Sequence, residues 1–283
     1  MSGHTGHPGH PGVPEPLLAV LDLVALERVA ADRFVSLPLP GNGPRLGGSE
    51  LLTAALLASA ATARAELAPS GAQASFLRSG RSDLPVDLTV AHLQDSRSSA
   101  VRAVTASQGG TPVMTASFRC FLPRHAPDWQ PEMVFDVPPH DGEEQLALVA
   151  TLPALRSFEV RAAVRPPDGR QVIHPYWIKS RQPLADDALL HAAVLLYLTD
   201  VGTSGSARAP HMSLRERMAP VSLDHTFWWH RSVRVDHWLR VDARSLTESG
   251  GRALARGEVV RADGVLAASF AQEVVVPEPR PTA

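Results

Sequence analysis

Apolar and polar residues alternate along several short segments of the chain. Every second residue is apolar in residues 86–90, 114–120 and 239–243. A period of two is typical of β-strands that turn one face to a core and the other outward. Residues 107–112 (SQGGTP) and 261–266 (RADGVL) carry the Gly-Gly and Asp-Gly steps that are typical of tight hairpins. The pattern therefore predicts antiparallel strands joined by hairpin turns.

The strand pattern occurs twice along the chain. Residues 86–121 align with residues 239–276, with a slippage of about one residue. Within this alignment the segment MTASF meets the segment LAASF. Such self-similarity predicts two copies of one structural unit.

A helical segment precedes each set of strands, at residues 49–67 and 185–199. The second segment is apolar almost all round, which is typical of a helix enclosed by other structure. Both segments open with residues that suit a helix N-terminus, namely Ser49, Glu50, Asp186 and Asp187. A strand, a buried helix and then antiparallel strands make up each half. This order predicts an α+β double hotdog, in which two tandem copies of a curled antiparallel sheet each wrap around a long helix.

The ends of the chain differ from its middle in composition. Residues 1–15 repeat Gly-His-Pro-Gly and have almost nothing to bury, so we expect a disordered tail. The proline-rich residues 277–283 are expected to form a second tail. Between the tails we expect an N-terminal hotdog at 16–122, a connector at 123–165 and a C-terminal hotdog at 166–276.

The charge balance limits the classes of partner. The chain has 27 Lys and Arg against 29 Asp and Glu, a net charge of -2, so no overall positive field exists to hold nucleic acid. The sheets of a hotdog have edges that must be covered, so we expect a homo-oligomer, most simply a homodimer.

The expected compartment is the cytoplasm. The N-terminus lacks the cationic start and apolar run of a signal peptide, and no segment approaches the length of a membrane span. The single cysteine, Cys120, cannot form an intramolecular disulfide or a thiolate zinc site, which is consistent with a reducing compartment and with no metal.

Two polar residues are candidates for chemistry. With Phe118 aligned to Phe270, Cys120 of the first copy corresponds to Gln272 of the second, on an inward face. A buried glutamine needs hydrogen-bond partners, so it is either a structural amide or part of a site. Asp200 lies at the end of the second helical segment, where the negative end of the helix raises a carboxyl pKa, as a general base requires. An ordinary aspartate in a turn is the alternative for Asp200.

A second combination of residues has the composition of a catalytic triad but not its geometry. Ser222, Asp224 and His225 supply the three side-chain types of a Ser-His-Asp triad. Adjacent residues of a strand point to opposite faces, so Asp224 and His225 are not expected to converge on Ser222.

Five segments resemble, in order and spacing, the acyl-CoA thioesterase II family. They are FLRSGRSDLPV (76–86), QDSRSSAVRAV (94–104), MTASFRCF (114–121), SLDHTFWWHR (222–231) and ARGEVVRADGVLAASFAQEVVV (255–276). The resemblance runs from about residue 17 to residue 276. It implies a double-hotdog enzyme that hydrolyses acyl-CoA to a free fatty acid and CoA, with no metal or organic cofactor.

The resemblance also implies an active site. The Asp, the Ser or Thr and the Gln that orient a water molecule in the family correspond to Asp200, Ser222 and Gln272 of this chain. The match is not complete near the first helix. The family's Gly-Gly-Gln is replaced by Gly47-Gly48-Ser49, and its histidine-rich segment by SGAQAS at 70–75.

Substrate contacts are expected at three further residues. Gly47 and Gly48 would let a thioester approach the amides at a helix N-terminus, where an oxyanion is stabilised, although a simple loop is an equal alternative. Arg231 is a candidate for the CoA phosphates, as are the other arginines of the chain.

Two other functions remain as alternatives. A hotdog hydratase or dehydratase acting on acyl thioesters needs a histidine paired with a carboxylate near the start of a helix, and neither helical segment begins with histidine. A non-catalytic module that binds acyl-CoA is the second alternative. A thioester hydrolysis assay distinguishes all three.

Overall fold

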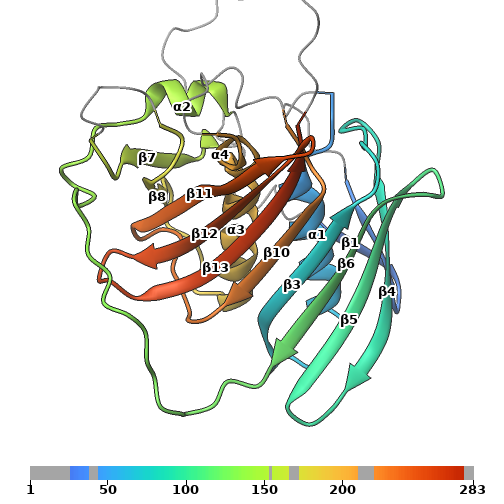
Figure 1. Cartoon of the computed structure of the whole chain (residues 1–283). Coiled ribbons are helices and arrows are strands. Elements are labelled where there is room, and N and C mark those ends of the chain that lie inside the picture. The colour runs from blue at the N-terminus through green and yellow to red at the C-terminus, as the bar shows by residue number, and fades with distance from the viewer. Residues whose placement is uncertain (1–25, 38–43, 153–154, 166–171, 210–219, 277–283) are drawn as a thin grey trace, which may run out of the picture.

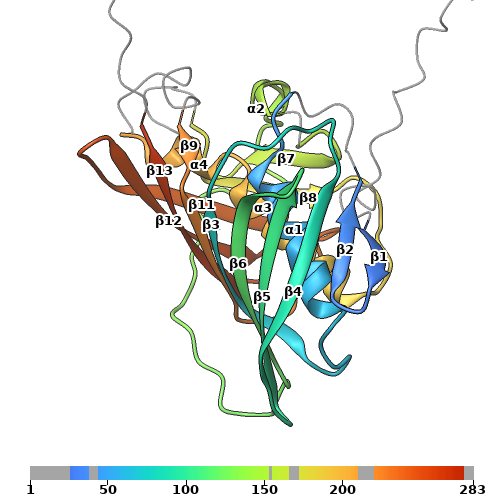
Figure 2. The same ribbon diagram turned by 90° about the vertical axis from the view of Figure 1, so that its right-hand side faces the viewer.

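The computed structural model of the chain describes residues 26–37, 44–152, 155–165, 172–209 and 220–276. The two tails predicted from the sequence lie outside these residues. In the described part, a single curled antiparallel sheet passes through both halves of the chain and wraps around two long helices (Figures 1 and 2).

The first half contributes one long helix, α1 (Gly48–Ala60). Its strands are β1 (Leu26–Ala30), β2 (Arg33–Ser36), β3 (Ala68–Phe76), β4 (Val86–Asp95), β5 (Ser99–Gln108) and β6 (Thr111–Phe121).

The second half repeats this order of elements. Its helices are α2 (Leu146–Thr151), α3 (Ala188–Asp200) and α4 (Thr203–Ala207). Its strands are β7 (Phe158–Ala162), β8 (Tyr176–Ser180), β9 (Val221–Ser222), β10 (Asp224–Trp229), β11 (Leu239–Ser249), β12 (Arg252–Arg261) and β13 (Leu266–Val275). Both α2 and β7 fall in the segment expected to be the connector. The sheet of the second half therefore begins before residue 166.

The order of the strands shows the duplication directly. Across the sheet it is β1-β2-β4-β5-β6-β3-β10-β13-β12-β11-β8-β7, so the two halves mirror each other about the β3–β10 junction. These two strands pair antiparallel from Asp224 opposite Ser75 to Trp228 opposite Gly71. The predicted α+β double hotdog is confirmed.

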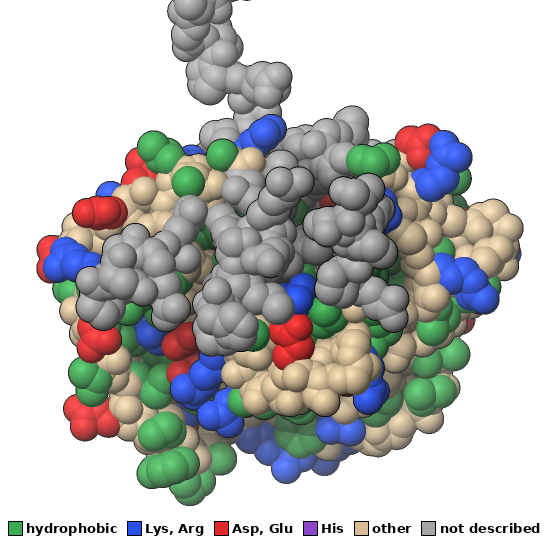
Figure 3. Space-filling view, turned by 45° about the horizontal axis from the view of Figure 1, so that its top comes forward, with side chains coloured by type: hydrophobic (Ala, Val, Ile, Leu, Met, Phe, Trp, Pro, Cys, Tyr) green, Lys and Arg blue, Asp and Glu red, His purple; other side chains and the backbone are tan. Residues whose placement is uncertain are grey.

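The helices α1 and α3 lie next to each other inside the curled sheet (Figure 1). Their apolar residues form one core with the inward side chains of the strands, and many leucines are fully buried, among them Leu52, Leu56, Leu195, Leu196 and Leu198. On the face seen in Figure 3, acidic and basic side chains both occur among polar and apolar ones.

The limits of the two helices differ from those predicted. Helix α1 ends at Ala60 rather than near Leu67, and Leu67 packs instead against Ala100 and Cys120 in a separate apolar cluster. Helix α3 begins at Ala188 because the Asp187 carboxylate caps it, accepting the backbone N–H of Leu189 at 2.9 Å.

The N-terminus of α1 is capped differently from the prediction. Gly47 is the cap residue, and its own backbone N–H donates to the Glu50 carboxylate at 3.0 Å. Beyond the end of α3, Gly202 has a φ of 80°, the left-handed conformation that favours glycine after a helix end.

The first testable prediction concerns Gly257 in β12, over which the Phe270 ring lies. A Cβ atom at this position would lie 2.1 Å from Phe270 Cζ and 2.5 Å from the Asp242 carbonyl oxygen. We expect Gly257→Ala to lower the free energy of unfolding by about 1 to 3 kcal/mol because the core is overpacked. Gly71→Ala is the matched control, since the nearest atom to its Cβ lies at 3.7 Å. Equal melting temperatures of the two variants would contradict the prediction.

Candidate active site

Three side chains from separate elements meet near the end of α3. The Gln272 amide nitrogen donates to Asp200 Oδ1 at 2.7 Å and to Ser222 Oγ at 2.6 Å. Asp200 is the last residue of α3, Ser222 is in β9 and Gln272 is in β13. The three residues that the family resemblance predicts are thus in direct contact, across 72 positions of sequence between Asp200 and Gln272.

Gln272 reaches the cluster because β13 alternates regularly. Ala268, Phe270, Gln272 and Val274 all point inward and are nearly or fully buried. Gln272 therefore lies on the same face as Phe270, as predicted from the repeat. It is the one polar side chain in this inward row, and its hydrogen bonds to Asp200 and Ser222 offset the cost of burying an amide nitrogen.

Ser222 reaches the cluster through a β-bulge. β9 and β10 pair with β13 in registers that differ by one residue, so Leu223 and Asp224 both face Glu273. The backbone N–H of Leu223 donates to the Glu273 carbonyl, and the N–H of Glu273 donates to the Asp224 carboxylate, each at 2.8 Å. In a regular strand, residues three apart lie on opposite faces. The extra residue turns both Ser222 and His225 inward.

The pKa of the Asp200 carboxyl is shifted towards neutral pH. Burial raises the pKa of its carboxyl to about 6, and the nearby Glu50 carboxylate adds to the rise. Hydrogen bonds from Gln272 and from the backbone N–H of Ser49 act in the opposite direction. The direction of the shift agrees with the sequence-based expectation, but its main cause is burial rather than the negative end of α3.

The start of α1 packs directly on the Asp200 carboxylate. A Cβ atom on Gly48 would lie 2.9 Å from Asp200 Oδ2 and 2.9 Å from Phe76 Cζ, so the absence of a side chain permits the contact. The backbone N–H of Ser49 faces the same carboxylate. Gly47 and Gly48 therefore lie at the cluster, with the positive end of α1 directed at Asp200. Their role in substrate binding stays a prediction.

His225 is a fourth residue at the cluster that the sequence reasoning did not assign. It is fully buried, and its Nε2 lies 3.3 Å from Thr199 Oγ1. Burial lowers its pKa to about 4, while the Gln272 side chain opposes this decrease. The carboxylate of Asp224 accepts from the backbone N–H of Glu273, and neither ring nitrogen of His225 contacts it. The Ser-His-Asp triad is absent from this part of the structure, as expected from strand geometry. The Asp224-His225 dipeptide is the signal in the sequence that points to His225.

Arg231 lies away from the cluster, beyond the end of β10. Its guanidinium pairs with the Asp128 carboxylate and donates to the Leu266 carbonyl at 2.8 Å. These contacts attach the segment after β6 to the outside of the second half, where it runs in Figure 1. The expected role of Arg231 in binding CoA phosphates stays a prediction.

The first half has no polar counterpart of the cluster among its described residues. The repeat and the strand registers relate Asp200 to Ala60, Ser222 to Leu67 and Gln272 to Cys120. Leu67 and Cys120 are buried together in an apolar cluster, and burial raises the pKa of the Cys120 thiol. The described structure thus has one such site per chain.

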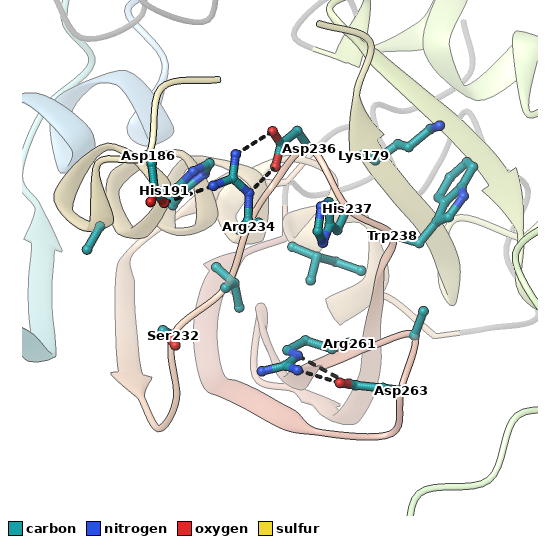
Figure 4. A pocket seen from close by; sticks show the side chains of 14 residues that line it. Lys179, Asp186, His191, Ser232, Arg234, Asp236, His237, Trp238, Arg261 and Asp263 are labelled. Atoms are coloured by element: carbon teal, nitrogen blue, oxygen red, sulfur yellow. Dashed lines mark hydrogen bonds and ion pairs between the residues drawn. The ribbon is translucent and has the colours of Figure 1, made fainter. Parts of the chain in front are cut away.

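A large pocket lies at the opposite end of α3 (Figure 4). Its volume is about 880 Å³, and His191, Trp238 and His237 are among its lining residues. Its charged side chains already form ion pairs, including Arg234 with Asp236 and Arg261 with Asp263. Since Asp200 ends the same helix, the pocket is separated from the cluster by the length of α3.

Comparison with known proteins identifies the family. A model of the acyl-CoA thioesterase N-terminal domain matches residues 51–121, and a model of the C-terminal domain matches residues 123–276. The chain belongs to the acyl-CoA thioesterase family. It is a thioester hydrolase that acts on acyl-CoA.

Individual relatives agree with this assignment. The thioesterase is 30% identical to human acyl-coenzyme A thioesterase 8 in an alignment of 256 positions that covers 82% of this chain and 80% of that protein. It is 28% identical to acyl-CoA thioesterase 2 of Haemophilus influenzae over 261 residues, covering 83% and 91% of the two chains.

Solved structures show the same fold over most of the chain. The acyl-CoA thioesterase II TesB2 of Mycobacterium marinum matches with a TM-score of 0.79 at 26% identity, covering 93% of this chain and all of that one. The tesB protein of Mycobacterium avium subs paratuberculosis matches with a TM-score of 0.77 at 30% identity, again over 93% of this chain.

The described residues lack two further kinds of feature, a membrane-spanning helix and a metal-binding cluster. No helix there is long and apolar enough to cross a membrane. No group of three His, Cys, Asp or Glu side chains in the same residues is placed to hold a metal ion.

The contact between Gly48 and Asp200 gives the second testable prediction. We expect Gly48→Ala to lower kcat for acyl-CoA hydrolysis at least about tenfold, because the methyl group displaces the Asp200 carboxylate. Gly71→Ala is the control, since the nearest atom to its Cβ lies at 3.7 Å. If the two variants hydrolyse acyl-CoA equally fast, the close packing at Gly48 does not position Asp200.

The raised pKa of Asp200 gives the third prediction, on stability. A folded-state pKa of about 6 lies above the ordinary value of 3.8, so protonation of Asp200 stabilises the folded state in acidic solution. This stabilisation is lost as the pH rises from the lower value to the higher one. Asparagine does not titrate. The melting temperature of Asp200→Asn relative to wild type should therefore increase between pH 4 and about pH 7.

Asp236→Asn is the control for this measurement. The hydrogen bond from Arg234 lowers the pKa of Asp236 from 3.8 to about 2, so the contribution of Asp236 to the free energy of unfolding changes with pH only below about pH 4. If the difference in melting temperature between Asp200→Asn and wild type stays constant from pH 4 to about pH 7, the pKa of Asp200 is not raised.

Proposed function

We propose that Asp200, Ser222 and Gln272 hold one water molecule against the thioester carbonyl, with Asp200 as the general base. The observation that carries this proposal is the Gln272 amide, which donates to both Asp200 and Ser222. As the water oxygen bonds to the carbonyl carbon, Asp200 takes a proton from it. The carbon–sulfur bond then breaks, the proton passes to the leaving thiolate, and free fatty acid and CoA result.

Each side chain has a distinct part in this mechanism. Both N–H groups of the Gln272 amide are occupied, so it fixes the separation of Asp200 and Ser222. Ser222 Oγ accepts from Gln272, which leaves its own proton for the oxygen of the water or the thioester. A base with a pKa of about 6 is ionised at neutral pH yet still able to accept a proton, as general-base catalysis requires.

The geometry supports hydrolysis over hydration or dehydration. A hydratase needs a histidine that exchanges a proton with substrate, whereas His225 is fully buried and has a pKa lowered to about 4. Its Nε2 faces Thr199 rather than a carboxylate. A non-catalytic module would have no need for a carboxylate with a raised pKa in contact with an amide and a hydroxyl.

The finer features of the function follow the same proposal. The substrate is a fatty acyl-CoA, whose thioester approaches Gly47 and Gly48, with Arg231 as a contact for the CoA phosphates. The enzyme acts in the cytoplasm, in keeping with its single cysteine, and as a homo-oligomer, in keeping with its open sheet.

A panel of acyl-CoA chain lengths tests the proposal, with a thiol reagent to detect released CoA. Stoichiometric release of free CoA and fatty acid is expected for at least part of the panel. Hydration or dehydration of an unsaturated or hydroxylated acyl-CoA with the thioester intact would favour the hydratase. Binding without turnover would favour the non-catalytic module.

The fourth prediction is that Asp200→Asn lowers kcat by about 10² to 10⁴, the usual contribution of general-base catalysis. Asparagine keeps the shape of the side chain and removes the base. Cys120→Ser is the control, because Cys120 occupies the equivalent place in the first half and should leave hydrolysis close to wild type. Should Asp200→Asn retain more than about a tenth of wild-type kcat, Asp200 would not be the base.

A further inference from the structure

The outer face of the second-half sheet carries an unusual arrangement of charge. In the pairing of β11 with β12, Asp242 lies directly opposite Glu258, and Arg244 lies directly opposite Arg256. The residues between them on β11 and beside them on β12 point into the core, so all four charged side chains share the outward face. Like charges directly opposite each other on a sheet are destabilising.

These charges are poorly compensated within the chain. Asp242 pairs with Arg240 at 3.1 Å, whereas Arg244, Arg256 and Glu258 form no ion pair with any residue that the structure describes. The four side chains, with the 43% exposed Trp228, surround a shallow hollow on this face. An arrangement that is repulsive within one chain, and next to an exposed tryptophan, is typical of a surface that another molecule covers.

The spacing of the two pairs makes the face complementary to itself. The acidic pair and the basic pair are two residues apart along both strands, a distance of about 7 Å. Consider a two-fold axis that lies parallel to the face, runs perpendicular to the strands and passes midway between the two pairs. A second copy related by this axis places its acidic pair over the basic pair of the first copy, and its basic pair over the acidic pair. A two-fold interface contains this contact between an acidic pair and a basic pair twice.

We propose that this outer face, the face of β10, β13, β12 and β11, is an isologous interface with a second copy of the chain. The acidic pair Asp242 and Glu258 of one copy meets the basic pair Arg244 and Arg256 of the other. Small outward side chains on β13, Ser269 and Ala271, allow the sheets to approach to the separation of about 10 Å that is usual for packed sheets.

The size of the face approaches that of a standard dimer interface when β3 is included. Four strands about 4.8 Å apart and up to about ten residues long present roughly 600 Å². A standard interface buries about 800 Å² on each partner, and the outward side chains of β3, which continues the sheet beyond β10, bring the face close to that area.

Charge reversal tests this interface. An acidic variant, Arg244→Glu with Arg256→Glu, and a basic variant, Asp242→Lys with Glu258→Lys, are each examined by sedimentation equilibrium. Each variant alone should be monomeric at concentrations where wild type is dimeric, with Kd raised at least about 100-fold. An equimolar mixture of the two should form a heterodimer. Glu27→Lys on the edge strand β1, a charge reversal at a distance, should leave the wild-type dimer intact.

The other outcomes overturn the proposal. A monomeric wild type, dimers of either variant alone, or a mixture that does not associate would each exclude this interface. A second measurement does not depend on the folding of the variants. The wild-type dimer should dissociate more readily in 1 M salt than at low ionic strength, since the Debye length falls to about 3 Å, and a Kd that does not rise with salt would also exclude it.

A second inference comes from two buried atoms at the active site. His225 Nδ1 and Gln272 Oε1 are both buried without a hydrogen-bond partner. The two residues are on neighbouring strands, one position beyond Thr226 and Ala271, which face each other in the register of β10 and β13. The effect of Gln272 on the pKa of His225 shows that the amide favours a proton on the ring.

We propose that His225 is a positioning residue for Gln272, an inference that rests on the proposed hydrolytic mechanism. The neutral ring donates its Nδ1–H to Gln272 Oε1, which keeps both amide N–H groups directed at Asp200 and Ser222. Its Nε2 then accepts from the Thr199 hydroxyl, 3.3 Å away, in place of the Leu196 carbonyl, to which that hydroxyl donates at 2.9 Å when the proton is on Nε2 instead. In this arrangement each polar atom of the Gln272 amide has a partner.

Asparagine and glutamine at residue 225 test which ring nitrogen matters. The asparagine amide nitrogen superposes on Nδ1 and the glutamine amide nitrogen on Nε2. We expect His225→Asn to keep kcat within about threefold of wild type, and His225→Gln and His225→Leu to lower it about tenfold or more with KM unchanged, as for the loss of one buried hydrogen bond.

Equal losses in the asparagine and glutamine variants, or none in the leucine variant, would overturn this role. A purely structural histidine would lower the melting temperature without that difference in kcat. Asp200→Asn, assayed beside these variants, separates the two ideas. If it is inactive while the His225 variants are normal, only the positioning role fails, and if it is fully active the hydrolytic mechanism itself fails.

Discussion

The pairing of β3 with β10 is the interaction on which the rest of this molecule depends. It joins two curled sheets into one and sets the two halves in opposite directions. As a consequence α1 and α3 lie next to each other, and the first turn of α1 meets the last turn of α3. Each half alone would expose its helix and one sheet edge, so burial of apolar surface and satisfaction of backbone hydrogen bonds both favour the joined form.

The meeting of two helix ends creates the electrostatic environment of the site. Asp200 extends from the negative end of α3, which disfavours its ionised form, and it faces the positive end of α1, which favours it. Burial is the main cause of the raised pKa of about 6, and the hydrogen bonds from Gln272 and from the backbone N–H of Ser49 oppose it. A carboxylate on an exposed turn would keep its ordinary affinity for protons. Elements from both halves of the chain thus set the pKa of Asp200, the proposed base.

The two halves share a fold but not a chemistry. Packing requires apolar side chains in equivalent places, and Ala60, Leu67 and Cys120 meet that requirement in the first half. In the second half the bulge at Leu223 and Asp224 turns Ser222 inward, where its hydroxyl contacts the Gln272 amide that also contacts the Asp200 carboxylate. A duplicated fold can therefore keep one polar site and use the other copy to complete the core and to supply the start of α1.

The sequence by itself determined the architecture, because alternation along the strands, the apolar helical segments and the internal repeat can all be read from the order of the residues. It indicated strands such as 86–90, two buried helices and the equivalence of Gln272 with Cys120, and the family resemblance pointed to Asp200 and Ser222. It placed the end of α1 too late, since the apolar pattern runs on to Leu67 although that residue belongs to another cluster.

Only the tertiary structure decided which polar groups meet. The bulge that turns Ser222 inward depends on a one-residue difference in register between strands far apart in the chain. The absence of a side chain at Gly48 matters only because Asp200 arrives from the other helix. The like-charge pairs on the outer face likewise appear only when β11 and β12 are aligned. Such contacts join residues whose separation in sequence carries no local signal, so they are fixed by packing and strand register.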